Sequence, residues 1–174
     1  MFKKTKTNNF NEGKLYNIIL KLSRNKLFYT KLCLTDTFQN RIYLIFLHVS
    51  FLFIKVKEDD KSEFSSRFTQ KVFDFIFKKI ELNMREIGYG DTTINKNMKY
   101  LIKIFYNILL SCENYKNKSS NDKNMFLCKY LELNIKKKGN INIELVKYFD
   151  KYHAFCFDLS LYSVLRGDLN FRYK

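Results

Sequence analysis

Histidine and cysteine are the side chains best suited to acid–base, nucleophilic or metal chemistry, and both are scarce in this chain. His48 and His153 are distant in sequence, and no serine or cysteine stands beside a base in a recognisable nucleophile motif. His48 lies inside an apolar run from Ile42 to Ile54, which favours a buried core histidine over a catalytic one. We therefore predict that the protein is not an enzyme.

A metal site is also not expected. The chain has four cysteines, Cys33, Cys112, Cys128 and Cys156. They form no C-x-x-C pair, and their spacings match no zinc-binding pattern. Their apolar neighbours instead predict buried free thiols in a reducing compartment. Acidic residues gather near Glu81, Glu86 and Asp91, but no second histidine is close enough in sequence to complete a site. We expect no metal and no other cofactor.

Composition predicts the fold class. The 174 residues are 46% hydrophobic, which is enough for one sizeable core, and the chain contains no proline and only 5 glycines. Apolar residues recur with helical spacing, as in Leu15, Ile18, Ile19 and Leu22. We predict an all-α protein, a single compact helical domain of about six to eight helices. It divides into a basic N-terminal tail (1–13), a helical domain (14–167) and a C-terminal tail (168–174).

Several helix boundaries can be predicted from capping residues and polar stretches. Asp36 is expected to cap a helix over 37–57, and Ser62 a long helix that ends at Ile87. The polar stretch 114–122 predicts a flexible loop, followed by a helix over 123–138. The Ile42–Ile54 run, about 13 residues, is too short to cross a bilayer and predicts a buried core helix.

The most informative local signal is a pair of glycines between two long helical patterns. Gly88 stands where a helix C-terminus needs a left-handed residue, and Gly90 follows after one residue. Asp91 or Thr93 can cap the next helix, because a short side-chain oxygen accepts hydrogen bonds from its first free N–H groups. Gly88 and Gly90 are thus predicted to form a structural corner, and exposed residues on such a corner are candidates for recognition.

The charge allows two interpretations. The net charge of +15 favours anionic partners such as nucleic acid, the ribosome or an acidic membrane face. The abundance of lysine, asparagine and isoleucine is equally what AT-rich coding produces. Charge alone therefore supports a class of partner only weakly, and we expect no specific binding to DNA.

The corner also carries a family resemblance. The string from Arg85 to Asp91, together with Lys96 and Met98 after it, resembles the signature of the ubiquinol–cytochrome c chaperone family. Tyr89 replaces the valine of the family pattern R-E-x-G-V-G-D. Other matching features follow in order along the chain: Leu15-Tyr16, Ser23-Arg24, Phe28-Tyr29, Asp36-Thr37, Arg41, Leu47-His48, Phe73-Asp74, Phe77 and Phe105-Tyr106. The few residues ahead of the first match resemble the bacterial members.

The resemblance implies a non-catalytic assembly chaperone of respiratory complex III with cytochrome b as its client. It implies as further partners a small helical protein, the ribosome and the anionic inner-membrane surface, and a cytoplasmic place peripheral to the inner membrane (the mitochondrial matrix in a eukaryote). We predict that Arg85, Glu86, Tyr89, Asp91 and Lys96 contribute to client or partner binding. Arg85 is expected to be the ion-paired member, with Glu86, Tyr89 and Lys96 more exposed.

An alternative from a different class is a basic helical protein that binds RNA or the ribosome without a respiratory role. Lysines would contact phosphates and the many tyrosines and phenylalanines would stack on bases. The periodicity argues against this alternative, because most aromatic residues fall on the core-facing stripes of the predicted helices.

Overall fold

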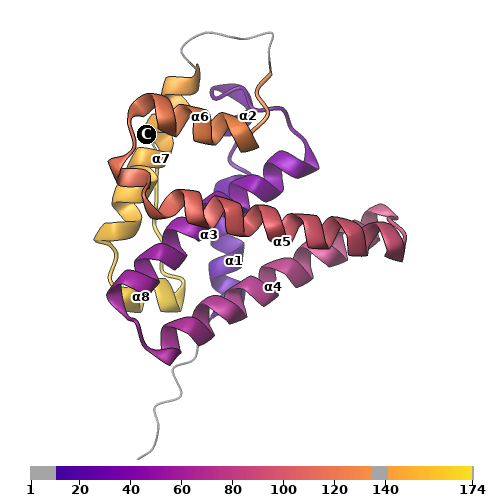
Figure 1. Ribbon diagram of the computed structural model, residues 1–174, viewed down its shortest axis with the longest axis horizontal. Coiled ribbons are helices and arrows are strands. Elements are labelled where there is room, and N and C mark those ends of the chain that lie inside the picture. The colour runs from indigo at the N-terminus through magenta and orange to yellow at the C-terminus, as the bar shows by residue number, and fades with distance from the viewer. Residues whose placement is uncertain (1–10, 135–140, 174) are drawn as a thin grey trace, which may run out of the picture.

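Eight α-helices and one 3₁₀ helix form the part of the chain that the computed structural model describes, residues 11–134 and 141–173 (Figure 1). In chain order they are α1 (Glu12–Ser23), α2 (Lys26–Thr30), α3 (Phe38–Asp59), α4 (Glu63–Ile87), α5 (Asp91–Glu113), the 3₁₀ helix (Tyr115–Asn117), α6 (Ser120–Tyr130), α7 (Ile141–Asp158) and α8 (Leu161–Arg166). Within those residues the β-structure is limited to an isolated antiparallel bridge between Leu34 and Leu133. The prediction of a single all-α domain is confirmed.

Helix α3 forms the centre of the core. Every residue from Ile42 to Ile54 is buried, and α1, α4, α5, α7 and α8 all pack against α3. The predicted core helix is therefore confirmed. None of the helices in the described residues is long and apolar enough to cross a membrane.

Aromatic rings join α3 to the two longest helices. Phe46 of α3 stacks on Phe77 of α4 with ring centroids 5.4 Å apart, and meets Phe105 of α5 edge-on at 5.3 Å. Phe73 of α4 also meets Phe105 edge-on at 5.3 Å. Such pairs contribute roughly 0.5–1.5 kcal/mol each beyond the burial of their area. This cluster fixes the α4–α5 hairpin against the body of the protein.

His48 joins α3 to α7 through buried hydrogen bonds. Its Nδ1 lies 2.6 Å from the Leu44 carbonyl oxygen and its Nε2 lies 2.8 Å from the Tyr148 hydroxyl. A neutral ring satisfies both, with Nδ1–H donating to Leu44 and Nε2 accepting from Tyr148. Complete burial lowers the pKa of His48 to about 4, against the opposing effect of the Leu44 carbonyl. His48 is therefore a core histidine, as predicted.

Asn40 is a second buried polar residue, and it ties the start of α3 to the segment after α6. Its side-chain amide donates to the Thr35 carbonyl at 2.7 Å and to the Glu132 carbonyl at 2.9 Å. Its side-chain oxygen accepts from the Glu132 backbone N–H at 2.9 Å. The Asn40 side chain thus supplies hydrogen bonds of the kind that a neighbouring β-strand would make to these backbone groups, which belong to no helix.

Three boundary predictions were wrong. Thr37, not Asp36, caps α3 by accepting from the Asn40 N–H, because Asp36 is engaged in a bidentate pair with Arg41. The expected loop 114–122 is instead the 3₁₀ helix and the start of α6, which Ser119 caps. The helix predicted over 123–138 begins earlier and ends at Tyr130, and its last predicted residues, 135–138, lie outside the described residues.

The prediction of buried thiols holds for three of the four cysteines. Cys33, Cys112 and Cys156 are buried, whereas Cys128 is exposed on α6. The exposure of Cys128 could not be predicted from its apolar sequence neighbours. Leu127 faces the core, and the next residue on a helix points in a different direction.

The chain after α8 packs back onto the body. Gly167 ends α8 with φ of 66°, and a side chain there would meet the backbone of Leu15 at 3.0 Å. Beyond it Leu169 is buried, and the Phe171 ring lies 5.6 Å from that of Tyr148 and 5.1 Å from that of Tyr152. The domain boundaries at residues 13 and 167 stay predictions.

Candidate functional site: the α4–α5 hairpin

The α4–α5 hairpin extends past the other helices, so that its tip lies at the edge of the molecule (Figure 1). Helix α4 ends in a Schellman motif: the Gly88 N–H donates to the Arg85 carbonyl and the Tyr89 N–H to the Met84 carbonyl. Gly88 has φ of 97°, the left-handed conformation expected from the sequence. The glycine corner is therefore a defined turn between the two longest helices.

The start of α5 differs from the prediction. Gly90 occupies the N-cap position without a side-chain hydrogen bond, so neither Asp91 nor Thr93 caps the helix. Arg85 instead bonds both Asp91 and Glu81, and the Arg85–Glu81 pair spans 2.9 Å. These two carboxylates, Glu81 first, raise the pKa of Arg85. Asp91, the first residue of α5, thus joins the two helices across the corner through Arg85, which is the ion-paired member that was expected.

The remaining predicted site residues are exposed and point to different places. Glu86 lines a groove of about 190 Å³ on the α1 side of the tip, which also contains Arg24 and Arg41. Tyr89 lines a groove of about 330 Å³ on the α5 side, beside Tyr100. We call these the α1-side groove and the α5-side groove. Lys96 is exposed on α5 and lines neither. The structure thus brings Arg85 and Asp91 together, but it places Glu86 and Tyr89 in separate grooves.

Substitution of Gly88 by alanine is expected to lower the free energy of unfolding by about 1 kcal/mol, and by valine more, up to about 3 kcal/mol. No atom lies within 4 Å of where a side chain would begin, so the cost is conformational and not steric. Gly90 is the matched control, because it has an equally open position but φ of −73°. Urea unfolding should show Gly90→Ala close to the unsubstituted protein. Equal stability of Gly88→Ala and Gly90→Ala would contradict the left-handed cap.

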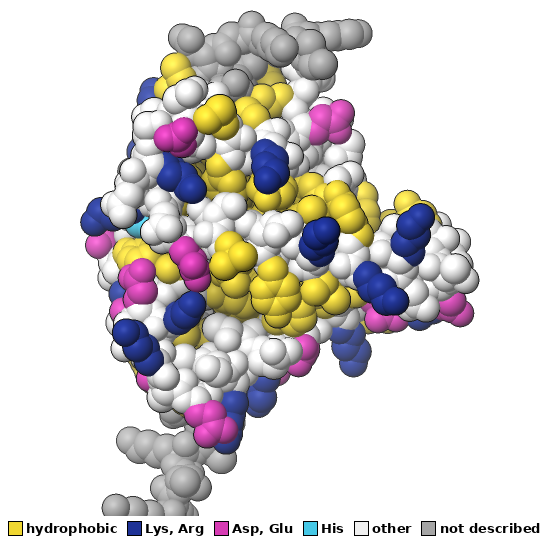
Figure 2. All heavy atoms as spheres, in the orientation of Figure 1, with side chains coloured by type: hydrophobic (Ala, Val, Ile, Leu, Met, Phe, Trp, Pro, Cys, Tyr) yellow, Lys and Arg dark blue, Asp and Glu magenta, His cyan; other side chains and the backbone are white. Residues whose placement is uncertain are grey.

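An apolar surface strip along the hairpin was not predicted. It consists of Phe73, Tyr106, Leu109 and Leu110. Tyr106 and Leu110 are 48% and 62% exposed, and the Phe73 ring lies 5.8 Å from that of Tyr106. Figure 2 shows apolar side chains gathered across the middle of this face, over α5 and toward α4. A contiguous exposed patch of this kind is typical of an interaction site.

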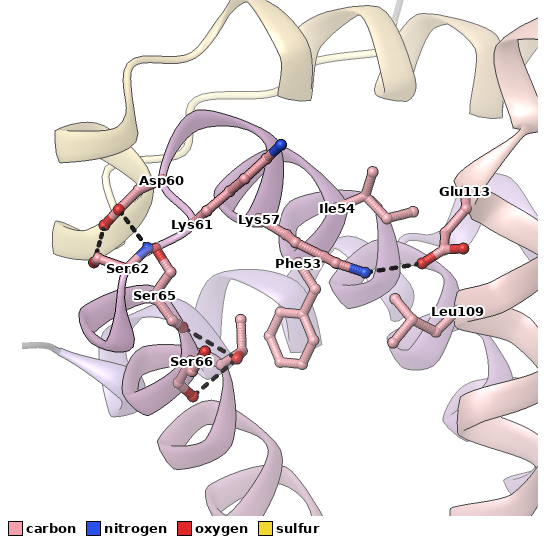
Figure 3. A pocket seen from close by; sticks show the side chains of 11 residues that line it. Phe53, Ile54, Lys57, Asp60, Lys61, Ser62, Ser65, Ser66, Leu109 and Glu113 are labelled. Atoms are coloured by element: carbon pink, nitrogen blue, oxygen red, sulfur yellow. Dashed lines mark hydrogen bonds and ion pairs between the residues drawn. The ribbon is translucent and has the colours of Figure 1, made fainter.

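The strip continues into a pocket of about 420 Å³ between the end of α3, the start of α4 and the end of α5. Figure 3 shows Phe53, Ile54 and Leu109 as its apolar part. An ion pair of 3.3 Å between Lys57 and Glu113 crosses one side. We call this the strip pocket. It offers an apolar recess at the end of the strip, with polar groups at its rim.

Neither the corner nor the strip assembles catalytic groups. Within the described ranges no group of three histidine, cysteine or acidic residues is arranged to hold a metal ion. These surfaces instead offer grooves and exposed apolar side chains that another protein chain can contact.

A family model described as ubiquinol–cytochrome C chaperone matches residues 30–171. The chain belongs to this family. The match covers the corner, the apolar strip and the strip pocket. Membership in the ubiquinol–cytochrome c chaperone family gives the protein a chaperone role in the assembly of complex III, which is a binding role and not an enzymatic one.

A solved structure shares the fold of this ubiquinol–cytochrome c chaperone. It is the crystal structure of the Cbp3 homolog from Brucella abortus, which is similar to this chain with a TM-score of 0.77 and 20% sequence identity. The likeness covers 93% of this chain and 88% of that one, and so extends beyond the hairpin to the whole helical domain. Among curated proteins no match is found.

Proposed function

We propose that the protein binds newly made cytochrome b through the apolar strip and holds it for assembly into complex III. Family membership supplies the assembly role and implies a client protein. The observation that carries the choice of surface is the row formed by exposed Tyr106 and Leu110 and half-buried Phe73 and Leu109, which ends in the strip pocket.

The chemistry of the strip suits a membrane-protein client. A transmembrane helix that has left the ribosome must cover its apolar side chains before it reaches its final neighbours. Tyr106 and Leu110 stand one turn apart on α5, and together with Phe73 they form an apolar row against which a client helix can lie. The strip pocket can then accept one bulky side chain of that helix, since Phe53 and Leu109 line it.

The tip of the hairpin is proposed as a separate contact for a partner. Glu86, Tyr89 and Lys96 are exposed there, and they differ in charge and shape. A small helical partner protein, the ribosome and the anionic inner-membrane surface are the candidates. The same chain then meets its client along the strip and a partner at the tip, with Arg85 and Asp91 maintaining the turn between the two helices.

Replacement of exposed strip residues by charged residues is expected to abolish capture of the client. In a cell-free translation of cytochrome b, the double variant Tyr106→Asp, Leu110→Asp should recover at least tenfold less client than the unsubstituted protein. Both side chains are exposed, so the melting temperature should change little. Tyr162→Asp is the matched control, because Tyr162 is an aromatic residue 65% exposed on α8 and should retain capture.

The single variants Glu86→Ala and Lys96→Ala distinguish the role of the hairpin tip from that of the strip. They should capture cytochrome b normally if the strip is the client site. Undiminished capture by the folded strip variant would remove the strip from the proposal. Normal complex III levels after deletion of the whole protein would remove the proposed function itself.

A further inference from the structure

A groove on the other side of α1 from the hairpin has a different chemistry from the strip, and it shares Arg24 with the α1-side groove. It lies between α1 and the chain after α8, with a volume of about 790 Å³. Its lining residues are Ile18, Lys21, Leu22, Arg24, Asn25, Tyr148, Leu169, Asn170, Phe171, Arg172 and Tyr173. None of them is acidic, although acidic residues make up a substantial part of the chain. We call it the basic groove.

The positive charges of the basic groove are free of acidic partners. Lys21, Arg24 and Arg172 are exposed, and none forms an ion pair with a carboxylate of the described residues. Asp168 bonds Lys14, and Glu144 bonds Lys147 at 2.7 Å and the Tyr173 hydroxyl at the groove's edge, so neither acid pairs with Lys21, Arg24 or Arg172. Cations on both walls of a concave groove reinforce each other's field and attract an anion into it.

Aromatic and amide groups lie among these charges. The Tyr173 ring lies 5.1 Å from that of Tyr148, and the Lys151 ammonium lies 4.8 Å from the Tyr173 ring centroid, which adds a further positive charge at the groove's edge. Asn170 is exposed and offers both donors and an acceptor, and exposed Asn25, whose side-chain oxygen caps α2, still offers its amide donors. Phosphate-binding cations, rings and amides in one groove are the elements of a nucleotide-binding surface.

We propose that the basic groove binds single-stranded RNA. Lys21 and Arg24 on α1 and Arg172 on the opposite wall contact phosphates, Tyr173 stacks against a base, and the asparagine amides bond base edges. Anionic lipid is the alternative ligand that the experiment must separate, because clustered Lys and Arg also attract lipid head groups. The basic groove and the client strip have no residue in common, so each proposal can be tested independently of the other.

Fluorescence anisotropy with labelled oligouridine and the full chain tests the proposal. The double variant Lys21→Gln, Arg172→Gln should bind roughly tenfold more weakly, and its plot of log K against log salt should be shallower by about 1.4, which is about 0.7 for each lost phosphate contact. Tyr173→Leu should weaken binding at least about fivefold without changing that slope, since stacking carries no charge.

A charge-matched control decides whether the groove or the general basicity is responsible. Lys99→Gln, Lys103→Gln removes the same charge from the exposed face of α5 and should leave RNA affinity within about twofold. Equal losses in the two double variants would show that binding is nonspecific and would overturn the site. A Lys21→Gln, Arg172→Gln variant that loses binding to phosphatidylglycerol vesicles but keeps its RNA affinity would assign the groove to lipid head groups. Each variant should keep its melting temperature and its capture of cytochrome b.

Discussion

Replacement of Asn40 by leucine is expected to lower the free energy of unfolding by on the order of 3 kcal/mol. The Asn40 side chain makes three hydrogen bonds, to the Thr35 carbonyl and to both backbone groups of Glu132. Leucine has a similar volume but no polar atom, so the Glu132 N–H loses its partner, and the Thr35 and Glu132 carbonyls each lose one of two hydrogen bonds, in a site where Asn40 is only 1% exposed. Leaving buried polar groups unpaired costs more than the net gain from each bond.

Denaturant unfolding followed by circular dichroism measures this loss. Asn107→Leu is the control, because Asn107 is exposed on α5 and the same exchange there should change stability by less than about 0.5 kcal/mol. Similar midpoints for the two variants would mean that the Thr35–Glu132 connection contributes little. A loss confined to Asn40→Leu would show that the Asn40 amide strengthens the backbone bridge between segments 92 residues apart.

Stability should fall by about 3 kcal/mol between pH 6.5 and pH 4 because of His48 alone. In the folded protein burial lowers the pKa of His48 to about 4 from its ordinary value of 6.5. Above pH 6.5 the ring is neutral in both states. Between pH 6.5 and pH 4 the unfolded chain takes up a proton that the folded chain does not, so each step down in pH favours unfolding. Below about pH 4 both states bind the proton and this effect stops growing.

The variant His48→Gln isolates this contribution. Glutamine cannot titrate, so the free energy of unfolding of this variant should decline less steeply as the pH falls over the same interval. The difference in slope corresponds to the uptake of at most one proton on unfolding. His153 also has a lowered pKa, chiefly through partial burial, and His153→Gln should keep most of the steep decline. Lowered carboxyl pKa values, such as those of Asp36 and Asp168, act at lower pH and are common to all three proteins. Parallel profiles for the unsubstituted protein and His48→Gln would contradict a buried neutral histidine.

The long helices and the glycine corner could be predicted because their signals are local. Apolar stripes repeat within each helix, and Gly88 is placed by the backbone conformation that a Schellman motif requires. Ser62 was predicted as the cap of α4 for the same reason, and it does accept from the Phe64 N–H. For these features the deciding information is the backbone conformation or the periodicity itself, and both can be seen in a few consecutive residues.

The errors at Asp36 and Asp91 arose because a carboxylate can either cap a helix or pair with a nearby arginine. Both look like helix caps, but Asp36 pairs with Arg41 and Asp91 with Arg85. Asn40 gave no signal at all, since its partner Glu132 is far along the chain. The apolar strip was missed because periodicity identifies the core-facing stripe but does not tell whether a second apolar stripe is covered by another element.

The two grooves at the hairpin tip have part of their lining in common. Phe38 and Ile42 at the start of α3 line both the α1-side groove and the α5-side groove. A substitution of Phe38 or Ile42 would therefore change both grooves at once, so the two binding surfaces at the tip cannot be altered independently through α3.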